Sequence, residues 1–289
     1  MARKLKLKRP LAHALARLPI ALAPDRPTFI IGCARSGTSI LKRMLACHES
    51  IAAFPGEANH LWHPTGYPWV ASDHRKPPLW SDPASFTKLS LADWSRGHGE
   101  RLRREFAIYQ RLRRKPVFLN KSAMIAFMLP EVLELFPEAR FIHIVRDGRP
   151  VALSYARKIH GKMQKSEEIH RANDLWCSFD DLLQQMARLW QVHLDEIDRV
   201  VQTNEWAEKG IYFECQYEDF CSRPRELIGE VLEFLNLPVE GMRFRKDLEV
   251  RSMNYKSCKE LSPESIRALT EIMSATLESR GYSSSEVGS

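Results

Sequence analysis

The stretch TFIIGCARSGTSILKRMLAC, residues 28–47, decides the fold of this chain. Its first six residues form a short apolar run rich in β-branched and aromatic side chains, which predicts a buried strand. Its last ten residues carry apolar side chains at helical spacing, at Ile40, Leu41, Met44 and Leu45. The segment is therefore predicted to be a strand, a tight loop and a helix in direct succession.

Four further segments repeat this order of a short apolar run, a loop and a helical pattern. They are residues 51–54, 117–120, 141–145 and 211–216. Strands that alternate with helices indicate a parallel sheet covered on both faces. We therefore expect an α/β protein: a P-loop-like, three-layer fold with a central parallel sheet of about five strands. A long helical pattern over residues 175–201 is expected to pack in the core.

The charge of the chain is concentrated at its start. The 289 residues carry a formal net charge of +7, and residues 1–26 hold seven basic side chains against one acid. We therefore divide the chain into a basic tail, residues 1–26, and a single domain, residues 27–289. The composition excludes collagen-like and wholly disordered classes. No apolar run approaches the roughly 20 residues that span a bilayer, and the start lacks a clear cleavage site. We expect a cytoplasmic protein whose tail is solvated or touches a membrane or a partner.

Cysteine and histidine spacing argues against a metal site. The six cysteines form no C-x-x-C pair, and His60 and His63 lack a third ligand. We expect reduced thiols and no metal.

The loop GCARSGTS, residues 32–39, has the spacing G-x-x-x-x-G followed by two hydroxyl residues. Between a strand and a helix, this spacing surrounds an oxyanion with backbone N–H groups. Thr38 replaces the lysine that an ATP-binding loop uses, and Arg35 supplies a cation at another position. The loop therefore favours an anionic ligand other than ATP; the alternative is that Gly32 and Gly37 merely permit a tight turn.

A second candidate anion site follows the strand at residues 141–145. Arg146 comes directly after that strand, Pro150 opens a helix, and Ser154 lies about two turns into it. Both side chains reach one phosphate only if it lies alongside the first turns. The alternative is a surface pair between Arg146 and Asp147.

Together the two sites resemble the PAPS-dependent sulfotransferases over about residues 28–237. The resemblance implies that the first loop binds the 5′-phosphosulfate of 3′-phosphoadenosine 5′-phosphosulfate (PAPS), through Arg35, Ser36, Gly37, Thr38 and Ser39. It implies that Arg146 and Ser154 bind the 3′-phosphate. It also implies that Tyr217 lies beside the nucleotide and that Lys256 reaches the 3′-phosphate region, although the glycine-rich form of the cytosolic enzymes is absent there.

Two further segments supply candidate catalytic residues in addition to Arg35. Lys121, in LNKS after the strand at residues 117–120, is similar to a lysine that contacts the sulfate-bearing phosphate. The segment FPGEANHLW resembles the glutamate-bearing segment of the tyrosylprotein and carbohydrate branches, so we expect Glu57 to be the base and partly buried. His60 and His63 are alternative bases, and an alternative role for Glu57 is to hold Arg35.

Three functions follow from these patterns. The first is a sulfotransferase, with Arg35, Lys121 and Glu57 as its catalytic residues and a sugar, lipid, small-molecule or tyrosyl hydroxyl as acceptor. The second is a P-loop kinase, which Thr38 disfavours. The third is a membrane- or nucleic-acid-binding protein that uses the tail and residues 96–115, which carry eight basic side chains and which we expect to be a solvated helix face. No nucleic acid is expected as a partner.

Overall fold

The computed structural model describes residues 21–62, 96–166, 176–245, 247–254 and 259–283. Its centre is a parallel five-stranded sheet in the order β2-β3-β1-β4-β5. The strands are β1 (Pro27–Ile31), β2 (Ile51–Ala53), β3 (Val117–Lys121), β4 (Arg140–Val145) and β5 (Tyr212–Gln216). All five predicted strands are confirmed, and so is the P-loop-like α/β fold.

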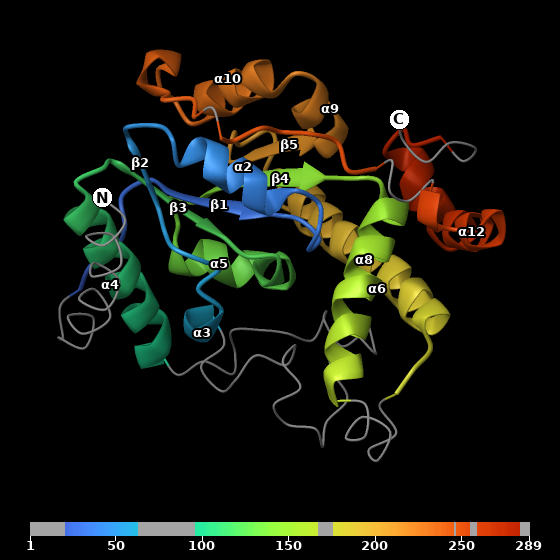
Figure 1. Cartoon of the computed structure of the whole chain (residues 1–289). Coiled ribbons are helices and arrows are strands. Elements are labelled where there is room, and N and C mark those ends of the chain that lie inside the picture. Colours follow the sequence, from blue (N-terminus) through green and yellow to red (C-terminus); the bar gives the residue numbers. More distant parts are fainter. Residues whose placement is uncertain (1–20, 63–95, 167–175, 246, 255–258, 284–289) are drawn as a thin grey trace.

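Helices cover both faces of this sheet (Figure 1). One face carries α2 (Thr38–Leu45), α9 (Tyr217–Ser222) and α10 (Pro224–Phe234). The other face carries α3 (Asn59–Trp62), α4 (Arg96–Arg113), α5 (Leu129–Leu135) and α8 (Phe179–Thr203). Helices α6 (Gly148–Met163) and α12 (Pro263–Ser279) pack against α8. Three short 3₁₀ turns complete the described elements: η4 (Met124–Phe127), η5 (Gln164–Ser166) and η6 (Val239–Gly241).

The central strand β1 shows why the sheet has a core on each side. Successive side chains of a strand point to opposite faces. Phe29 and Ile31 pack with α4, α5 and α8, whereas Ile30 packs with α2 and α10. All three are fully buried. A strand buried on both faces reads as a continuous apolar run, which is the pattern that identified it in the sequence.

The long helical pattern is confirmed as α8, but the helix begins at Phe179 rather than four residues earlier. Ser178 caps it, because its hydroxyl accepts the Asp181 backbone N–H at 3.1 Å and the Asp181 carboxylate accepts the Ser178 backbone N–H in return. Trp190 is fully buried in this helix, as core packing requires.

Helix α4 differs in part from the expected solvated helix. Its basic side chains alternate with Leu102, Phe106 and Tyr109, which are buried against the sheet. The helix is therefore amphipathic, and its apolar side holds it to the fold.

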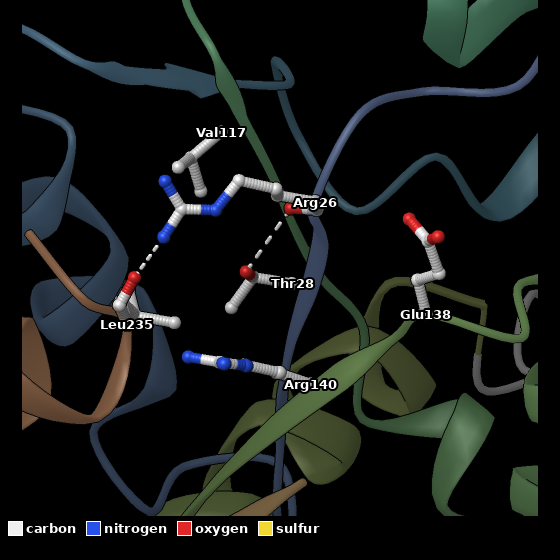
Figure 2. Close-up of a pocket in the computed structure, with 6 residues that line it drawn as sticks. All are labelled: Arg26, Thr28, Val117, Glu138, Arg140 and Leu235. Carbon is white, nitrogen blue, oxygen red and sulfur yellow. Dashed lines mark hydrogen bonds between the residues drawn. The ribbon is translucent and has the colours of Figure 1, made fainter.

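The amino edge of the sheet holds a small pocket of about 190 Å³ (Figure 2). Arg26 and Arg140 both point into it and donate hydrogen bonds to backbone carbonyls at the end of α10, Arg26 to Leu235 and Arg140 to Phe234. Carbonyls at a helix C-terminus carry partial negative charge, so these guanidinium groups stabilise that end. Arg26, assigned to the tail from the sequence, is thus bound to the domain.

The described residues contain no disulfide: Cys33, Cys47, Cys177, Cys215 and Cys221 are all free thiols. None of the helices described is both long enough and apolar enough to cross a membrane.

Candidate active site

The predicted site residues come from loops at one edge of the sheet. The strands are parallel, so β1, β2, β3 and β4 all end at the same edge. Open α/β sheets bind their ligands outside the carboxyl ends of the strands. The loop after β1 carries Arg35, the loop after β2 carries Glu57, β3 ends at Lys121, and Arg146 follows β4.

The loop after β1 is wound tightly against its neighbours. Gly32, Arg35 and Gly37 all have positive φ, of 132°, 81° and 95°. A Cβ atom on Gly32 would lie 2.5 Å from the carbonyl oxygen of Ile144, and one on Gly37 would lie 2.5 Å from the ring of Tyr217. Both glycines are therefore needed for backbone conformation and for close approach. This loop lies against β4 and α9, which brings it to the second motif.

The loop presents hydroxyl donors at the start of α2. Ser36 is 1% exposed, and its Oγ atom has no hydrogen-bond partner among the described residues. Thr38 is buried in the first turn of α2, and Ser39 is exposed. A buried hydroxyl without a partner is unfavourable, and an oxyanion at the helix N-terminus would accept its hydrogen bond. The donor set therefore fits an anion.

The guanidinium group of Arg146 is held on three sides. Its Nε donates to Asn254 Oδ1 at 2.8 Å, its Nη1 donates to the carbonyl of Arg35 at 2.9 Å, and the group lies 4.4 Å from the ring centre of Tyr217. The residue is 6% exposed, and burial lowers its pKa below the ordinary arginine value. Arg146 is therefore a buried cation in a fixed orientation.

The alternative surface pair between Arg146 and Asp147 is wrong. Both residues are buried, and the Asp147 carboxylate binds Arg149 instead, with Oδ2 accepting from Nη2 at 2.8 Å. Asp147 also caps α6 by accepting the Arg149 backbone N–H. Asp147 thus stabilises the start of α6 and pairs with Arg149 rather than with Arg146.

One pocket joins the two motifs. Its volume is about 440 Å³, and its lining includes Arg35, Arg146 and Ser154. The Nε atom of Arg35 donates to Ser154 Oγ at 2.9 Å across 119 positions of the sequence. The pocket also contains Arg157 and Lys158 on the next turn of α6, which the sequence analysis missed. Their spacing of three and four residues after Ser154 was the available signal.

A chain of buried and half-buried hydrogen bonds lies behind Arg146. Asn254 Nδ2 donates to Glu218 Oε1 at 2.8 Å, and the hydroxyl of Tyr282 donates to Glu218 Oε2 at 3.0 Å. Asn254 is completely buried. Sequence reasoning did not identify Glu218, because the residues that it joins are separated from it by 36 and 64 positions.

Glu57 is paired with Lys121 rather than with Arg35. Lys121 Nζ donates to Glu57 Oε1 in an ion pair, with the lysine side chain 7% exposed and the glutamate side chain 37% exposed. The expected partial burial of Glu57 is confirmed. Beside this pair, Lys42 of α2 donates from Nζ to the carbonyl of Gly56 at 2.5 Å. Lys42 was not predicted as a site residue.

Two of the predicted site residues lie outside the described residues. They are Lys256 and His63, and the side chain of His60 is likewise not described. The ring of Tyr217, which the resemblance places beside the nucleotide, lies against the Arg146 guanidinium group, and its hydroxyl donates to the carbonyl of Arg251 at 3.1 Å. Burial raises the pKa of Tyr217 to about 12, so the ring stays neutral. In the part of the chain that the structure describes, no three His, Cys, Asp or Glu side chains gather as around a metal ion.

Comparison with known proteins identifies the family of this chain. The model described as "Sulfotransferase family" matches residues 27–241. Two curated relatives, both omega-hydroxy-beta-dihydromenaquinone-9 sulfotransferase Stf3, come from Mycobacterium bovis and Mycobacterium tuberculosis. Each is 23% identical in an alignment of length 263 that covers 76% of this chain and 65% of the relative. The chain therefore spans slightly less than two thirds of their length.

Solved structures share the fold at low sequence identity. Sulfotransferase STF9 from Mycobacterium avium matches with a TM-score of 0.54 and 13% identity, covering 94% of this chain and 80% of its own. The sulfotransferase domain from the curacin biosynthetic pathway matches with a TM-score of 0.52 and 17% identity, covering 91% of this chain and 99% of its own.

Proposed function

The chain belongs to the sulfotransferase family, and from this premise we propose that it transfers a sulfuryl group from PAPS to a hydroxyl acceptor. The observation that carries the proposal is the pocket shared by Arg35, Arg146 and Ser154. Its lining joins Arg35 of the first loop to Arg146 and Ser154 of the second motif, and PAPS has two separate anionic groups for cations at these two motifs to bind. Two observations disfavour the kinase alternative: position 38 is threonine where an ATP-binding loop has lysine, and the matching family model is that of the sulfotransferases.

The residues of the site divide between the two ends of the donor. Arg146 and Ser154, with Tyr217 packed on the guanidinium group, suit the 3′-phosphate. The loop around Ser36 and the start of α2 suit the 5′-phosphosulfate, since they offer N–H and hydroxyl donors in a tight turn. Lys256 remains part of this proposal as a further 3′-phosphate ligand.

The proposed reaction is an in-line displacement at sulfur. The acceptor oxygen forms a bond to sulfur while the bond from sulfur to the bridging phosphate oxygen breaks, and that oxygen leaves with the electron pair. Glu57 takes the acceptor proton, and Lys121 and Arg35 stabilise the negative charge that develops on the leaving phosphate. The ion pair between Glu57 and Lys121 supports these roles, since it holds base and cation side by side.

The acceptor is proposed at the level of a hydroxyl-bearing molecule: a sugar, a lipid, a small molecule or a tyrosyl group. The curated relatives are named for an omega-hydroxylated dihydromenaquinone, so lipid alcohols are the first acceptors to test. A cytoplasmic location, with the basic residues 1–26 meeting a membrane or a partner, belongs to the same proposal. Cell fractionation of the full chain and of a chain lacking residues 1–20 tests it.

Calorimetry and turnover test the proposed function. We expect wild-type protein to bind 3′-phosphoadenosine 5′-phosphate (PAP) more tightly than ATP with Mg²⁺, and to move labelled sulfate from PAPS to at least one hydroxyl acceptor. Glu57→Gln should lower kcat by about 10²- to 10⁴-fold, the usual range for a general base, and leave the Kd for PAP within about twofold.

Glu49→Gln is the matched control, because Glu49 is exposed and pairs with Arg243 away from the site. It should behave as wild type. A preference for ATP would overturn the function, whereas near-normal turnover by Glu57→Gln would overturn only the role of Glu57.

A further inference from the structure

Lys42 lies beside the ion pair of Glu57 and Lys121, and it belongs neither to the loop at residues 32–39 nor to the segment at residues 146–154. It sits on α2, one turn after Thr38, and its side chain is half-buried. Its Nζ donates to the carbonyl oxygen of Gly56 at 2.5 Å, and the next residue is Glu57. Helix α2 starts at the anion-binding loop, so Lys42 links that loop to the segment that carries Glu57.

The segment around Glu57 has a backbone that needs support. Gly56 and Ala58 on either side of Glu57 both have positive φ, of 70° and 59°. The left-handed region is unfavourable for alanine, so surrounding contacts must hold this turn in place. The bond from Lys42 to Gly56 is such a contact, and it acts directly at the peptide that precedes the carboxylate.

Two charged groups face Lys42 from two other elements: Lys121 at the end of β3 and Glu57 after β2. Burial, followed by the charge of Lys121, lowers the pKa of Lys42 to about 8, and the charge of Glu57 opposes this shift. Lys42 is therefore mostly protonated at neutral pH and loses its proton just above it.

We propose that Lys42 is a positioning residue for Glu57: its ammonium group holds the Gly56 carbonyl and thereby directs the carboxylate toward Lys121. The inference rests on the proposed function, in which Glu57 is the base. Lys42 touches neither donor nor acceptor in this role and acts through Glu57.

Loss of the Lys42 proton weakens the hydrogen bond to the Gly56 carbonyl, because a neutral amine is a poorer donor than an ammonium group. Activity should therefore fall as pH rises through the titration of Lys42, and the profile of kcat/KM against pH reports this titration in the free enzyme.

The test compares Lys42→Arg and Lys42→Met with wild type in the full chain. We expect Lys42→Met to lower kcat about ten- to a hundred-fold while the Kd for PAP stays within about twofold. We expect Lys42→Arg to keep kcat within about threefold at pH 7, because arginine supplies both the donor and the charge. Its kcat/KM should stay level above pH 8, where that of wild type falls, since arginine does not lose its proton there.

Arg43→Met is the control, since Arg43 is exposed on the same helix and its loss removes the same charge. It should match wild type in kcat and in pH profile. If Lys42→Met has the same kcat and the same pH profile as wild type, the inference is overturned. A Lys42→Arg profile that falls near pH 8 as in wild type also overturns it, and this second measurement decides the matter if Lys42→Met does not fold. Absence of turnover in wild type refutes the proposed function instead, so the two failures are distinguishable.

Discussion

Asn254→Ala gives a sharp test of how the structure orients Arg146. The substitution removes two hydrogen bonds of a buried amide, one accepted from Arg146 Nε at 2.8 Å and one donated to Glu218 at 2.8 Å. A hydrogen bond to a charged group contributes about 1.5–3 kcal/mol. If the free energy of binding a 3′-phosphate becomes less favourable by this amount when Arg146 is no longer held in place, the affinity should fall about ten- to a hundred-fold, since about 1.4 kcal/mol corresponds to a factor of ten.

The assay is calorimetry with two ligands, PAP and AMP, which differ by the 3′-phosphate. Wild-type protein should bind PAP more tightly than AMP. Asn254→Ala should raise the Kd for PAP and leave the Kd for AMP nearly unchanged. The Kd for AMP divided by the Kd for PAP should therefore fall about ten- to a hundred-fold. A loss of folding would weaken both ligands together, and thermal unfolding of the variant without ligand provides the check.

Asn254→Asp separates the two bonds. It keeps an oxygen for Arg146 Nε but places a carboxylate against Glu218, where the amide donated before. We expect this variant to lose thermal stability more than Asn254→Ala does. An unchanged ratio of PAP to AMP affinity in Asn254→Ala, with the variant folded, would refute the claim that Asn254 orients Arg146.

Two further predictions concern the framework of the site. Gly37→Ala should lower the free energy of unfolding in urea by more than about 1 kcal/mol and weaken PAP binding, since it combines a left-handed residue with a contact 2.5 Å from the Tyr217 ring; wild-type stability would contradict this. Burial acts to raise the pKa of Glu214, but hydrogen bonding and the charges of His143 and Arg280 overcome it and hold the value at about 2, below the ordinary 4.5. The lowered pKa contributes stability above pH 4.5 that is lost as pH falls toward 2, so the difference in urea midpoint between wild type and Glu214→Gln should shrink over that range. A constant difference from pH 6 to pH 2.5 would argue against this origin.

Much of the fold was readable from local sequence. Strands β1, β3 and β4 each contain a run of apolar residues with β-branched and aromatic side chains, and burial on both faces of a parallel sheet produces such a run. The tight loop before α2 was equally readable, because Gly32 and Gly37 sit where only glycine fits. Apolar periodicity and turn-forming residues depend only on residues close together in the sequence. Strands and tight turns can therefore be predicted without knowing how the rest of the chain folds.

The limits of an element were less readable than its existence. The start of α8 was expected at residue 175, whereas Ser178 caps the helix and Phe179 begins it. Apolar spacing marks the buried side of a helix and says little about its first turn. The capping box of Ser178 and Asp181 was present in the sequence and was the better signal.

The sequence by itself determined that the proposed site residues gather at one edge of the sheet, because parallel strands end at a common edge and Arg35, Lys121 and Arg146 each follow or end a strand. Only the tertiary structure decided their partners. Glu57 pairs with Lys121 across 64 positions, and Arg146 meets Asn254 across 108. These contacts depend on the order of strands in the sheet and on how closely side chains pack over its edge, and neither is encoded in the spacing of residues along the chain.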